Sequence, residues 1–286
     1  MFTSLSPGTI GIRDISLPRA IELAKLGGFE GLEFSIVEAA QLADEKGVEY
    51  VKGLFAEAGV RPSAWGLPVD WRGDDAKLDQ GLLALPDLAA TGRKLGCDRV
   101  FTWIVPGSDE RPFADNFEWH TRRFRLIARV LADSGCRIGL EFIGPKTMRA
   151  QRQFAFLYTL EGMLELARSI GTGNVGILLD AWHLHTSGGS ADDVRKLRSA
   201  DVVTVHVNDA PEGIPVDEQI DQVRCLPMET GVIDLPGFLR ALQSIEYDGP
   251  VTPEPFSKRV NAMPAEDAVR ETGESMRKAW KAADLA

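Results

Sequence analysis

Four side chains of the types that bind metal ions stand at or near the ends of short apolar segments between residues 141 and 254. Glu141 and Asp180 lie at the ends of two such segments, His206 lies inside a third, and Glu254 stands between two prolines. Three carboxylates brought close together repel one another unless a cation neutralises them. Oxygen ligands with one imidazole suit Mn²⁺, Mg²⁺ or Co²⁺, and Zn²⁺ also accepts such a set. We therefore expect one divalent metal ion, provided that the fold gathers the four side chains.

The elements that must position these residues follow a recurring pattern along the chain. A helix-like stretch ends at a glycine and a short β-branched run follows, six times between residues 24 and 255. Glycine commonly ends a helix because it adopts the left-handed conformation at little cost. The pattern predicts eight strands, at about Gly8–Ile12, Gly31–Phe34, Arg61–Trp65, Arg99–Trp103, Arg137–Phe142, Val175–Asp180, Val202–Val207 and Val251–Glu254.

This alternation of strands and helices indicates the fold class. It predicts a parallel sheet, and eight units of each kind predict a closed (β/α)₈ TIM barrel of the α/β class. The length of 286 residues suits such a barrel. We expect a single domain over residues 1–286, because no linker rich in Pro, Gly and Ser divides the chain. An open doubly wound sheet is the alternative, but no GxGxxG motif follows the first predicted strand.

A TIM barrel carries its active site at the carboxyl ends of its strands. Glu141, Asp180, His206 and Glu254 come from four consecutive predicted strands, so the barrel would deliver all four to one rim. Each residue alone is equally well explained as a polar side chain that bonds to the backbone at a strand end. Their joint position on one rim favours a metal site.

Several segments around these residues resemble the xylose isomerase-like barrel superfamily. The matching segments are LEF at 140–142, LLDAWH at 178–183, VHVND at 205–209 and PEP at 253–255. The resemblance covers nearly the whole chain and is closest to the sugar phosphate isomerase/epimerase branch, which includes ketohexose 3-epimerases and inosose-processing enzymes. It implies that the metal ligands are Glu141, Asp180, His206 and Glu254. It also implies that the two glutamates act as catalytic acid and base.

The same resemblance suggests residues that bind substrate. The family motif D-x-x-H corresponds to residues 180–183 and makes His183 a substrate ligand. A motif of an arginine followed by a glutamate and GxID matches Arg224 and residues 229–234, although this chain has LPMETG where many relatives have LPGEG. The planar guanidinium of Arg224 could hold a sugar hydroxyl or a phosphate through two hydrogen bonds. The alternative is an ordinary arginine of a surface loop.

Further substrate-binding candidates come from the predicted strand ends. Trp65 and Trp103 end two strands, where aromatic faces can cover the C–H patches of sugars, although barrel packing explains them equally well. Lys146 closely follows the fifth predicted strand and could reach the same mouth. Glu33 and Arg13 lie near the ends of the second and first predicted strands and are further candidates of this kind.

Two glutamates on different arcs of the rim suit proton transfer next to a carbonyl. One carboxylate could remove a proton from one face of a sugar and the other could return a proton to the opposite face. A metal ion would stabilise the enediolate. We therefore expect an isomerase or epimerase of a keto sugar, a sugar phosphate or an inosose. A lyase or dehydratase that acts on a keto sugar, an inosose or a 3-oxo-glycoside shares these parts and stays open.

Two other function classes fit the sequence less well. Nucleases that resemble endonuclease IV gather several metals with many more histidines, whereas this chain has four histidines in all. A sugar-binding protein without catalytic activity has no need of two opposed glutamates.

Composition narrows the partners and the cellular compartment. The net charge of −10 argues against nucleic-acid binding as the main role, although acidity also favours solubility. Three cysteines without a CxxC pair suit a reducing compartment, and neither a signal peptide nor an apolar run of ~18 residues is visible. We expect a cytoplasmic enzyme of carbohydrate metabolism that acts on a small sugar or cyclitol and has no nucleic-acid or membrane partner. A homo-oligomer is compatible with this fold.

Overall fold

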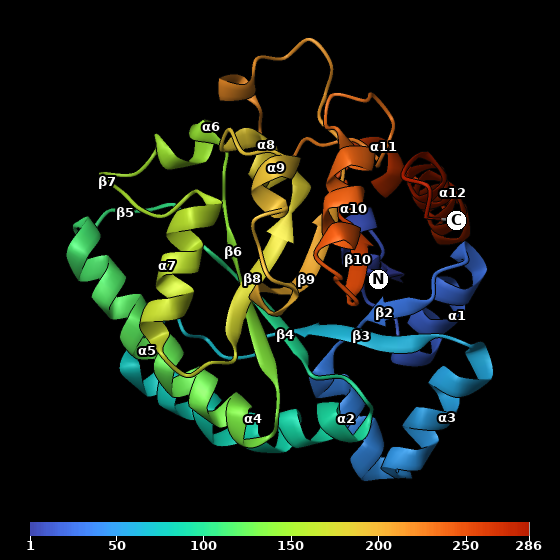
Figure 1. Ribbon diagram of the computed structural model, residues 1–286. Helices are drawn as coiled ribbons and strands as arrows, with labels where there is room; N and C mark the ends of the chain where they lie inside the picture. The colour runs from blue at the N-terminus through green and yellow to red at the C-terminus, as the bar shows by residue number, and fades with distance from the viewer. Residues whose placement is uncertain (286) are drawn as a thin grey trace.

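Eight short strands run parallel and close on themselves into a barrel (Figure 1). The computed structural model describes residues 1–285. Around the barrel the strands follow the order β1-β10-β9-β8-β6-β4-β3-β2, so each strand pairs with the barrel strand before and after it in the chain. The strands are β1 (Phe2–Leu5), β2 (Gly31–Glu33), β3 (Arg61–Gly66), β4 (Arg99–Ile104), β6 (Arg137–Phe142), β8 (Val175–Asp180), β9 (Val202–Val207) and β10 (Pro250–Pro253).

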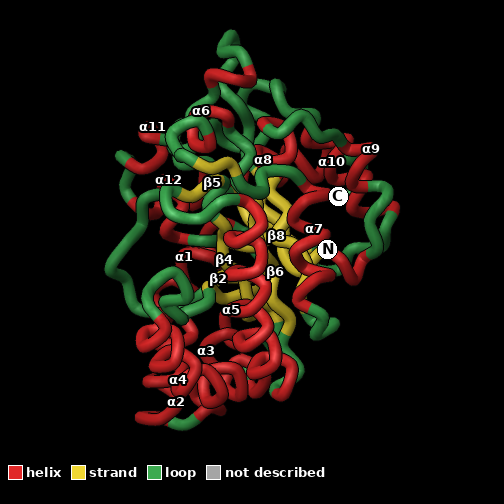
Figure 2. The backbone as a smooth tube through the Cα atoms, turned by 90° about the vertical axis from the view of Figure 1, so that its left-hand side faces the viewer, coloured by secondary structure: helices red, strands yellow, loops and turns green. Residues whose placement is uncertain are grey.

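Long helices surround the barrel, and the shorter ones lie toward one end of it (Figures 1 and 2). The long helices are α1 (Leu17–Gly27), α2 (Ile36–Lys46), α3 (Val48–Ala58), α4 (Asp75–Lys94), α5 (Phe113–Asp133), α7 (Leu160–Ile170), α10 (Leu235–Ser244) and α12 (Ala265–Ala282). The short ones are α6 (Lys146–Arg149), α8 (Ala181–Thr186), α9 (Ala191–Val194) and α11 (Lys258–Asn261), with 3₁₀ turns η1 (Pro7–Ile10), η2 (Ser199–Asp201) and η3 (Val216–Glu218). A two-stranded antiparallel ribbon joins β5 (Gly107–Ser108) to β7 (Phe154–Ala155).

The predicted (β/α)₈ barrel is confirmed, and seven of the eight predicted strands match the structure to within about a residue at each end. The first predicted strand, Gly8–Ile12, is wrong. Most of that segment forms the 3₁₀ turn η1, which begins at Pro7, and Gly11 ends the turn with a φ of 82°. Proline is common at the first position of a helical turn, where its missing amide hydrogen is not needed. In a strand, the same missing hydrogen removes a hydrogen bond to the neighbouring strand. The true first strand is Phe2–Leu5.

The core lies inside the barrel and between the barrel and its helices. Every residue of β9 is buried, as expected for a parallel strand that is covered on both faces. Helix α5 presents its apolar side to the barrel, where Phe124, Ile127 and Leu131 are fully buried. This packing fixes the strands that carry the functional side chains. Among residues 1–285, no helix is both long and apolar enough to span a bilayer.

The carboxyl ends of β6, β8, β9 and β10 face one end of the barrel, where α6, α8 and long loops gather (Figures 1 and 2). The longest of these connections runs from the end of β9 to the start of α10 and contains only η3. This end is the catalytic face in barrels of this class.

Candidate metal centre and substrate pocket

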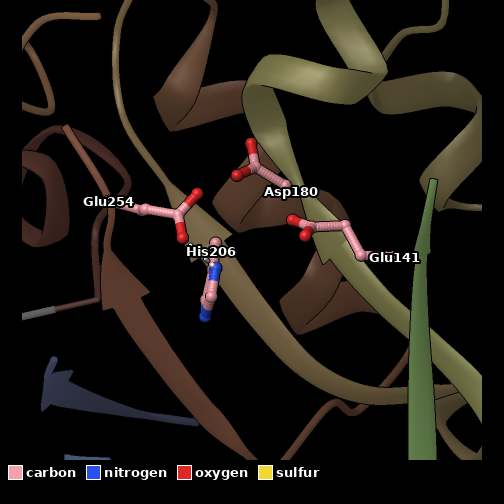
Figure 3. Close-up of side chains that lie close together, drawn as sticks. All are labelled: Glu141, Asp180, His206 and Glu254. Atoms are coloured by element: carbon pink, nitrogen blue, oxygen red, sulfur yellow. Dashed lines mark ion pairs between the residues drawn. The ribbon is translucent and has the colours of Figure 1, made fainter. Parts of the chain in front are cut away.

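The four predicted metal ligands converge at the carboxyl end of the barrel (Figure 3). Each of Glu141, Asp180, His206 and Glu254 offers one ligand atom, and these atoms all lie within 4.8 Å of one another. The parallel register puts Asp180 of β8 directly beside His206 of β9, while Glu254 follows the last residue of β10. The structure thus brings together the residues that the sequence singled out. Their binding of a metal stays a prediction.

His206 is oriented so that one ring nitrogen faces the cluster. Its Nε2 lies 3.1 Å from Oε1 of Glu33, and the same oxygen accepts a hydrogen bond from the Thr252 hydroxyl at 2.8 Å. The other ring nitrogen, Nδ1, is buried and lies 3.3 Å from Oε1 of Glu254. Within residues 1–285 neither this Nδ1 nor Oε1 of Glu141 has a hydrogen-bond partner. Buried polar atoms normally have one, so these two atoms fit a metal-ligand role.

Asp180 joins the cluster to the start of helix α8. Its Oδ1 accepts the backbone amide of Trp182 at 2.6 Å and the side-chain amide of Asn208 at 3.2 Å. Its Oδ2 forms an ion pair with Arg224 at 2.9 Å. Burial opposes ionisation of Asp180, but Arg224 and the nearby imidazoles outweigh it and lower the pKa of this carboxyl. Asp180 is therefore a carboxylate at neutral pH.

Arg224 is buried in the site and is not an exposed arginine of a surface loop. The guanidinium is buried and forms ion pairs with Asp180 at 2.9 Å, with Asp221 at 2.8 Å and with Glu254 at 2.8 Å. Burial disfavours its charge, but the three carboxylates overcome that cost and raise the pKa of Arg224. The arginine therefore stays charged and neutralises part of the acidic cluster. It also lines the pocket, as its predicted contact with substrate requires.

The pKa values of the two glutamates shift in the opposite direction from that of Asp180. Burial raises the pKa of Glu141 well above its ordinary value, and the charges of Glu254 and Asp180 add to the effect. Burial also raises the pKa of Glu254, although His206 and Arg224 partly oppose it. Carboxyl groups with a raised pKa are better suited to take up and release protons near neutral pH.

His183 is placed to contact a substrate oxygen. The backbone amide of Gly144 lies 3.2 Å from its Nδ1, and Nη2 of Arg224 lies 3.3 Å from its Nε2. This Nε2 lies 3.7 Å from Oε1 of Glu141 and 3.8 Å from Oδ1 of Asp221. Burial lowers the pKa of His183 to about 4, so the imidazole is neutral at pH 7. It is a neutral imidazole that lies between Arg224 and one of the two glutamates.

A cavity of about 640 Å³ opens above these side chains. Trp103 lines it, because β4 and β6 pair in register and Trp103 stands beside Glu141 at the rim. Trp103 therefore lies at the mouth of the cavity, and its contact with substrate stays a prediction. The remaining lining combines polar and apolar side chains: Ile143, Thr147, Met148, Gln151, His183, Ile220, Asp221, Gln222, Arg224 and Phe256, together with the two glutamates.

Two predicted substrate contacts do not reach the cavity. Trp65 is fully buried, and its indole packs against helix α4 so closely that a side chain on Gly92 would meet its Nε1 at 2.9 Å. Lys146 forms an exposed ion pair with Asp217 at 2.6 Å and does not line the cavity. Trp65 points outward because successive strand residues face opposite sides of the barrel wall. Both predictions are corrected: Trp65 is part of the packing, and Lys146 belongs to the outer loops.

Other residues gain importance from the structure. Glu33 supports His206 directly, a more specific role than its position at a strand end had suggested. Asp221 pairs with Arg224, and Phe256 packs over the Arg224 guanidinium at 4.9 Å. Asn208, within the VHVND segment, binds Asp180. Asp221 lies in a long loop without periodicity, where the sequence offers no signal that would single it out.

Comparison with known proteins gives the family. A family model described as a xylose isomerase-like TIM barrel matches residues 21–279. The chain belongs to the xylose isomerase-like TIM barrel family. The resemblance expected from the sequence segments is thereby confirmed. The solved xylose isomerase domain protein from Alicyclobacillus acidocaldarius superposes with a TM-score of 0.89 and 29% identity, over 99% of each chain.

Curated relatives and a second solved structure extend the comparison. An inosose isomerase from Bacillus subtilis (strain 168) is 28% identical over 144 residues, which are 50% of this chain and 49% of that protein. A 3-dehydroshikimate dehydratase from Pseudomonas aeruginosa is 27% identical over 255 residues, 87% of this chain and 37% of that protein. The chain thus spans half or less of the length of these relatives. A zinc-bound IOLI protein shares the fold, with a TM-score of 0.79 and 19% identity over 99% of this chain and 98% of that one.

Proposed function

We propose that this chain is a divalent-metal-dependent isomerase or epimerase of a keto sugar or cyclitol. The observation that carries the proposal is the pair Glu141 and Glu254, which face each other across the ligand cluster at the floor of the cavity (Figure 3). Sequence similarity to an inosose isomerase supports the substrate class.

The donor set supports one divalent cation held by Glu141, Asp180, His206 and Glu254. Three carboxylates and one imidazole are the ligand types that Mn²⁺, Mg²⁺ and Co²⁺ accept, and Zn²⁺ is compatible. The zinc atom in the IOLI protein is consistent with a metal in this fold. When bound, such a cation supplies positive charge that stabilises negative charge developing on the substrate oxygens.

The side chains of this chain perform the proton transfers in the proposed reaction. A glutamate in its carboxylate form removes the proton from the carbon next to the carbonyl. The opposite glutamate, in its protonated form, returns a proton to the other face, so the configuration of that carbon inverts. Both groups have a raised pKa, which brings the protonated and ionised forms closer in energy near neutral pH. The neutral imidazole of His183 forms a hydrogen bond with a substrate hydroxyl group, and Arg224 balances the negative charge of the floor.

A lyase or dehydratase is the second candidate. The similarity to a 3-dehydroshikimate dehydratase, which covers 87% of this chain, favours it. Elimination begins with the same removal of a proton next to the carbonyl. It differs in its second step, in which a hydroxyl group leaves as water after one protonated carboxyl donates to it. The same two glutamates serve both reactions, so the product distinguishes them.

The test is incubation of Mn²⁺-loaded protein with ketohexoses, inososes and 3-dehydroshikimate in D₂O, followed by proton NMR. An isomerase or epimerase yields deuterium at the carbon next to the carbonyl together with the epimeric or isomeric sugar. A dehydratase yields a vinylic or aromatic signal and loss of water. Absence of exchange, isomerisation and elimination across the panel would contradict both candidates.

A further inference from the structure

The cavity has two chemically different parts. Its floor carries the charged and imidazole side chains described above, whereas four apolar side chains form what we call the outer wall: Trp103, Met148, Ile220 and Phe256. Trp103 is 43% exposed and Ile220 is 56% exposed. Ile220 and part of Trp103 are therefore open to solvent, while the Arg72 guanidinium stacks on the Trp103 ring at 4.1 Å from its centroid. Apolar side chains that group together at the mouth of a pocket commonly mark a ligand-binding surface.

The cavity is larger than an unsubstituted sugar requires. A ketohexose has twelve non-hydrogen atoms, which take up at most roughly 360 Å³ even at the ~30 Å³ that a water molecule occupies in the liquid. The cavity measures about 640 Å³. A sugar bound at the floor, with its carbonyl near the glutamates, leaves room against the outer wall for a further group of ring size.

The charges around the cavity disfavour an anionic substrate. Glu141, Asp221 and Glu254 all line it, and among the described lining residues Arg224 is the cation. Its guanidinium is already engaged by three carboxylates. Lys146, on the nearby loop, is paired with Asp217, and Arg72 stacks on the Trp103 ring without lining the cavity. A phosphate or carboxylate group at the floor would therefore meet the negative charge of Glu141, Asp221 and Glu254.

Phe256 shows that the outer wall is built at a cost to the backbone. Its φ is +40°, in the left-handed region that a bulky side chain rarely adopts. This conformation holds the ring 4.9 Å from the Arg224 guanidinium, directly after the Glu254-Pro255 turn. Strained residues concentrate at ligand sites, because surrounding structure must hold them there. Phe256 thus joins the floor to the outer wall.

We propose that the substrate is an uncharged polyhydroxy ketone that carries an apolar substituent about the size of one aromatic ring. The ketone occupies the floor and the substituent lies on the outer wall, between Trp103 and Ile220. This inference rests on the proposed function, since it assumes that the floor binds the reacting carbonyl. It predicts selection against phosphorylated sugars and for neutral glycoside-like ketones.

The experiment is isothermal titration of Mn²⁺-loaded protein with two matched pairs of probes. The first pair is the phenyl and the methyl 3-keto-β-glucoside, which differ only in the substituent. The phenyl compound should bind roughly 10- to 100-fold more tightly, because it buries an aromatic ring on the outer wall. The second pair is D-fructose and D-fructose 6-phosphate. The phosphate should bind at least about 10-fold more weakly than the free sugar, because like charges repel at short range.

A variant pair attributes the selectivity to the outer wall. Ile220→Ser should reduce the ratio of phenyl to methyl affinity to a few-fold, while Leu83→Ser, at an apolar residue of α4 that is 82% exposed, should leave the ratio unchanged. Equal affinities for the phenyl and methyl compounds in the wild type would contradict the proposal that the substrate carries an apolar substituent. Tighter binding of the phosphate than of D-fructose would overturn the uncharged substrate. Both results leave the proposed function standing.

The two proposals can fail separately. Preferential binding of the phenyl compound without any deuterium exchange or elimination would overturn the proposed function and leave the preference of the cavity established. Failure of all four probes to bind the Mn²⁺-loaded protein would overturn both, since neither the floor nor the outer wall would then recognise a polyhydroxy ketone.

Discussion

Glu33 holds the imidazole of His206 in the orientation that directs Nδ1 toward the other predicted ligands. Its Oε1 lies 3.1 Å from Nε2 of His206 and accepts the Thr252 hydroxyl at 2.8 Å. A carboxylate on the far nitrogen of a metal-binding histidine fixes the ring and increases its basicity. Glu33 is therefore expected to set the affinity for the cation without touching it.

Glu33→Gln should weaken binding of Mn²⁺ by roughly 10- to 100-fold, the usual effect of losing such a support. Titration calorimetry on metal-stripped protein measures it. Glu30→Gln is a matched control, because Glu30 precedes the same strand but forms an exposed ion pair with Arg61. Unchanged Mn²⁺ affinity in Glu33→Gln would show that the contact does not support a metal ligand.

His120 gives a pH dependence that is separate from the metal centre. The imidazole lies inside α5, donates through Nδ1 to the Asn116 carbonyl at 2.7 Å and packs among Trp71, Trp119 and Phe156. Burial lowers its pKa from 6.5 to about 4. Between these pH values the unfolded chain binds a proton that the folded chain does not. The stability contributed by neutral His120 is therefore complete above pH 6.5 and is lost as the pH falls toward 4.

The loss amounts to roughly 3 kcal/mol of unfolding free energy over this pH range. Urea unfolding at several pH values should show a steeper fall for the wild type than for His120→Gln, whose amide does not titrate. The variant should be less stable at neutral pH, because it loses ring packing. The slope of the unfolding free energy against pH nevertheless measures the proton taken up by His120 on unfolding. Parallel pH profiles for the two proteins would contradict a depressed pKa of His120.

The positions of single site residues were only partly predictable from the sequence. The four predicted ligands were found because each stands at the carboxyl end of a strand, where the barrel fold dictates a common rim. Trp65 was misplaced because the sequence shows that a residue ends a strand but not which side of the wall it faces. A shift of one residue reverses that side. Asp221 and Phe256 lie outside helices and strands, where no periodicity of apolar residues in the sequence indicates their position in the site.

At the level of elements, the site depends on the close approach of the loop after β6 to helix α8. Gly144 lies in this loop, and its amide donates to His183. A Cβ at position 144 would lie 2.3 Å from the His183 carbonyl oxygen and 2.5 Å from the Thr186 hydroxyl. The clash with the His183 carbonyl oxygen cannot be relieved by a side-chain rotation, because this oxygen belongs to the backbone. The loop and the helix would have to separate.

Gly144→Ala should therefore lower the unfolding free energy by roughly 1–3 kcal/mol, the usual cost of overpacking, and displace His183. Gly53→Ala is the control: Gly53 lies in α3 with open space around it, and alanine there should stabilise the protein by roughly 0.5–1 kcal/mol. Chemical denaturation compares the two. Equal stability of Gly144→Ala and the wild type would mean that the contact between loop and helix is not tight.

The elements themselves were largely predictable, and the exception has a physical explanation. Glycine after a helical stretch indicated the helix ends, and Gly28, Gly59 and Gly171 indeed adopt a positive φ at helix C-caps. The first strand was misplaced because residues 8–12 contain β-branched side chains but follow Pro7, which starts a 3₁₀ turn. The short strand Phe2–Leu5 carries too few residues for a clear alternation.

At the level of the whole molecule, folding and metal binding are expected to be separable. The core inside and around the barrel is formed by apolar side chains of all eight strands, whereas the predicted ligands lie at one end. A ligand that binds only the folded state stabilises it by about 2.7 kcal/mol at 100 times its Kd. The cation should therefore add to the stability of a fold that forms without it.

Removal of metal with EDTA should lower the Tm by several degrees and leave the far-ultraviolet circular dichroism spectrum unchanged. Added Mn²⁺ should restore the Tm of the wild type but not that of Asp180→Asn. The expected stoichiometry by elemental analysis is close to one divalent ion per chain. A chelated protein that loses its helical signal would contradict a metal confined to the mouth of the barrel.

In the proposed reaction Glu141 and Glu254 transfer protons on opposite faces of a bound keto sugar, and hydrogen exchange in D₂O detects each transfer separately. Glu141→Gln and Glu254→Gln, each loaded with Mn²⁺, are incubated with both epimers of a turned-over sugar, and proton NMR follows the carbon next to the carbonyl. Each variant should exchange only the epimer whose proton faces the remaining glutamate, and epimerisation should slow by ~10²–10⁴-fold. Undiminished epimerisation in both variants would contradict the proposed reaction.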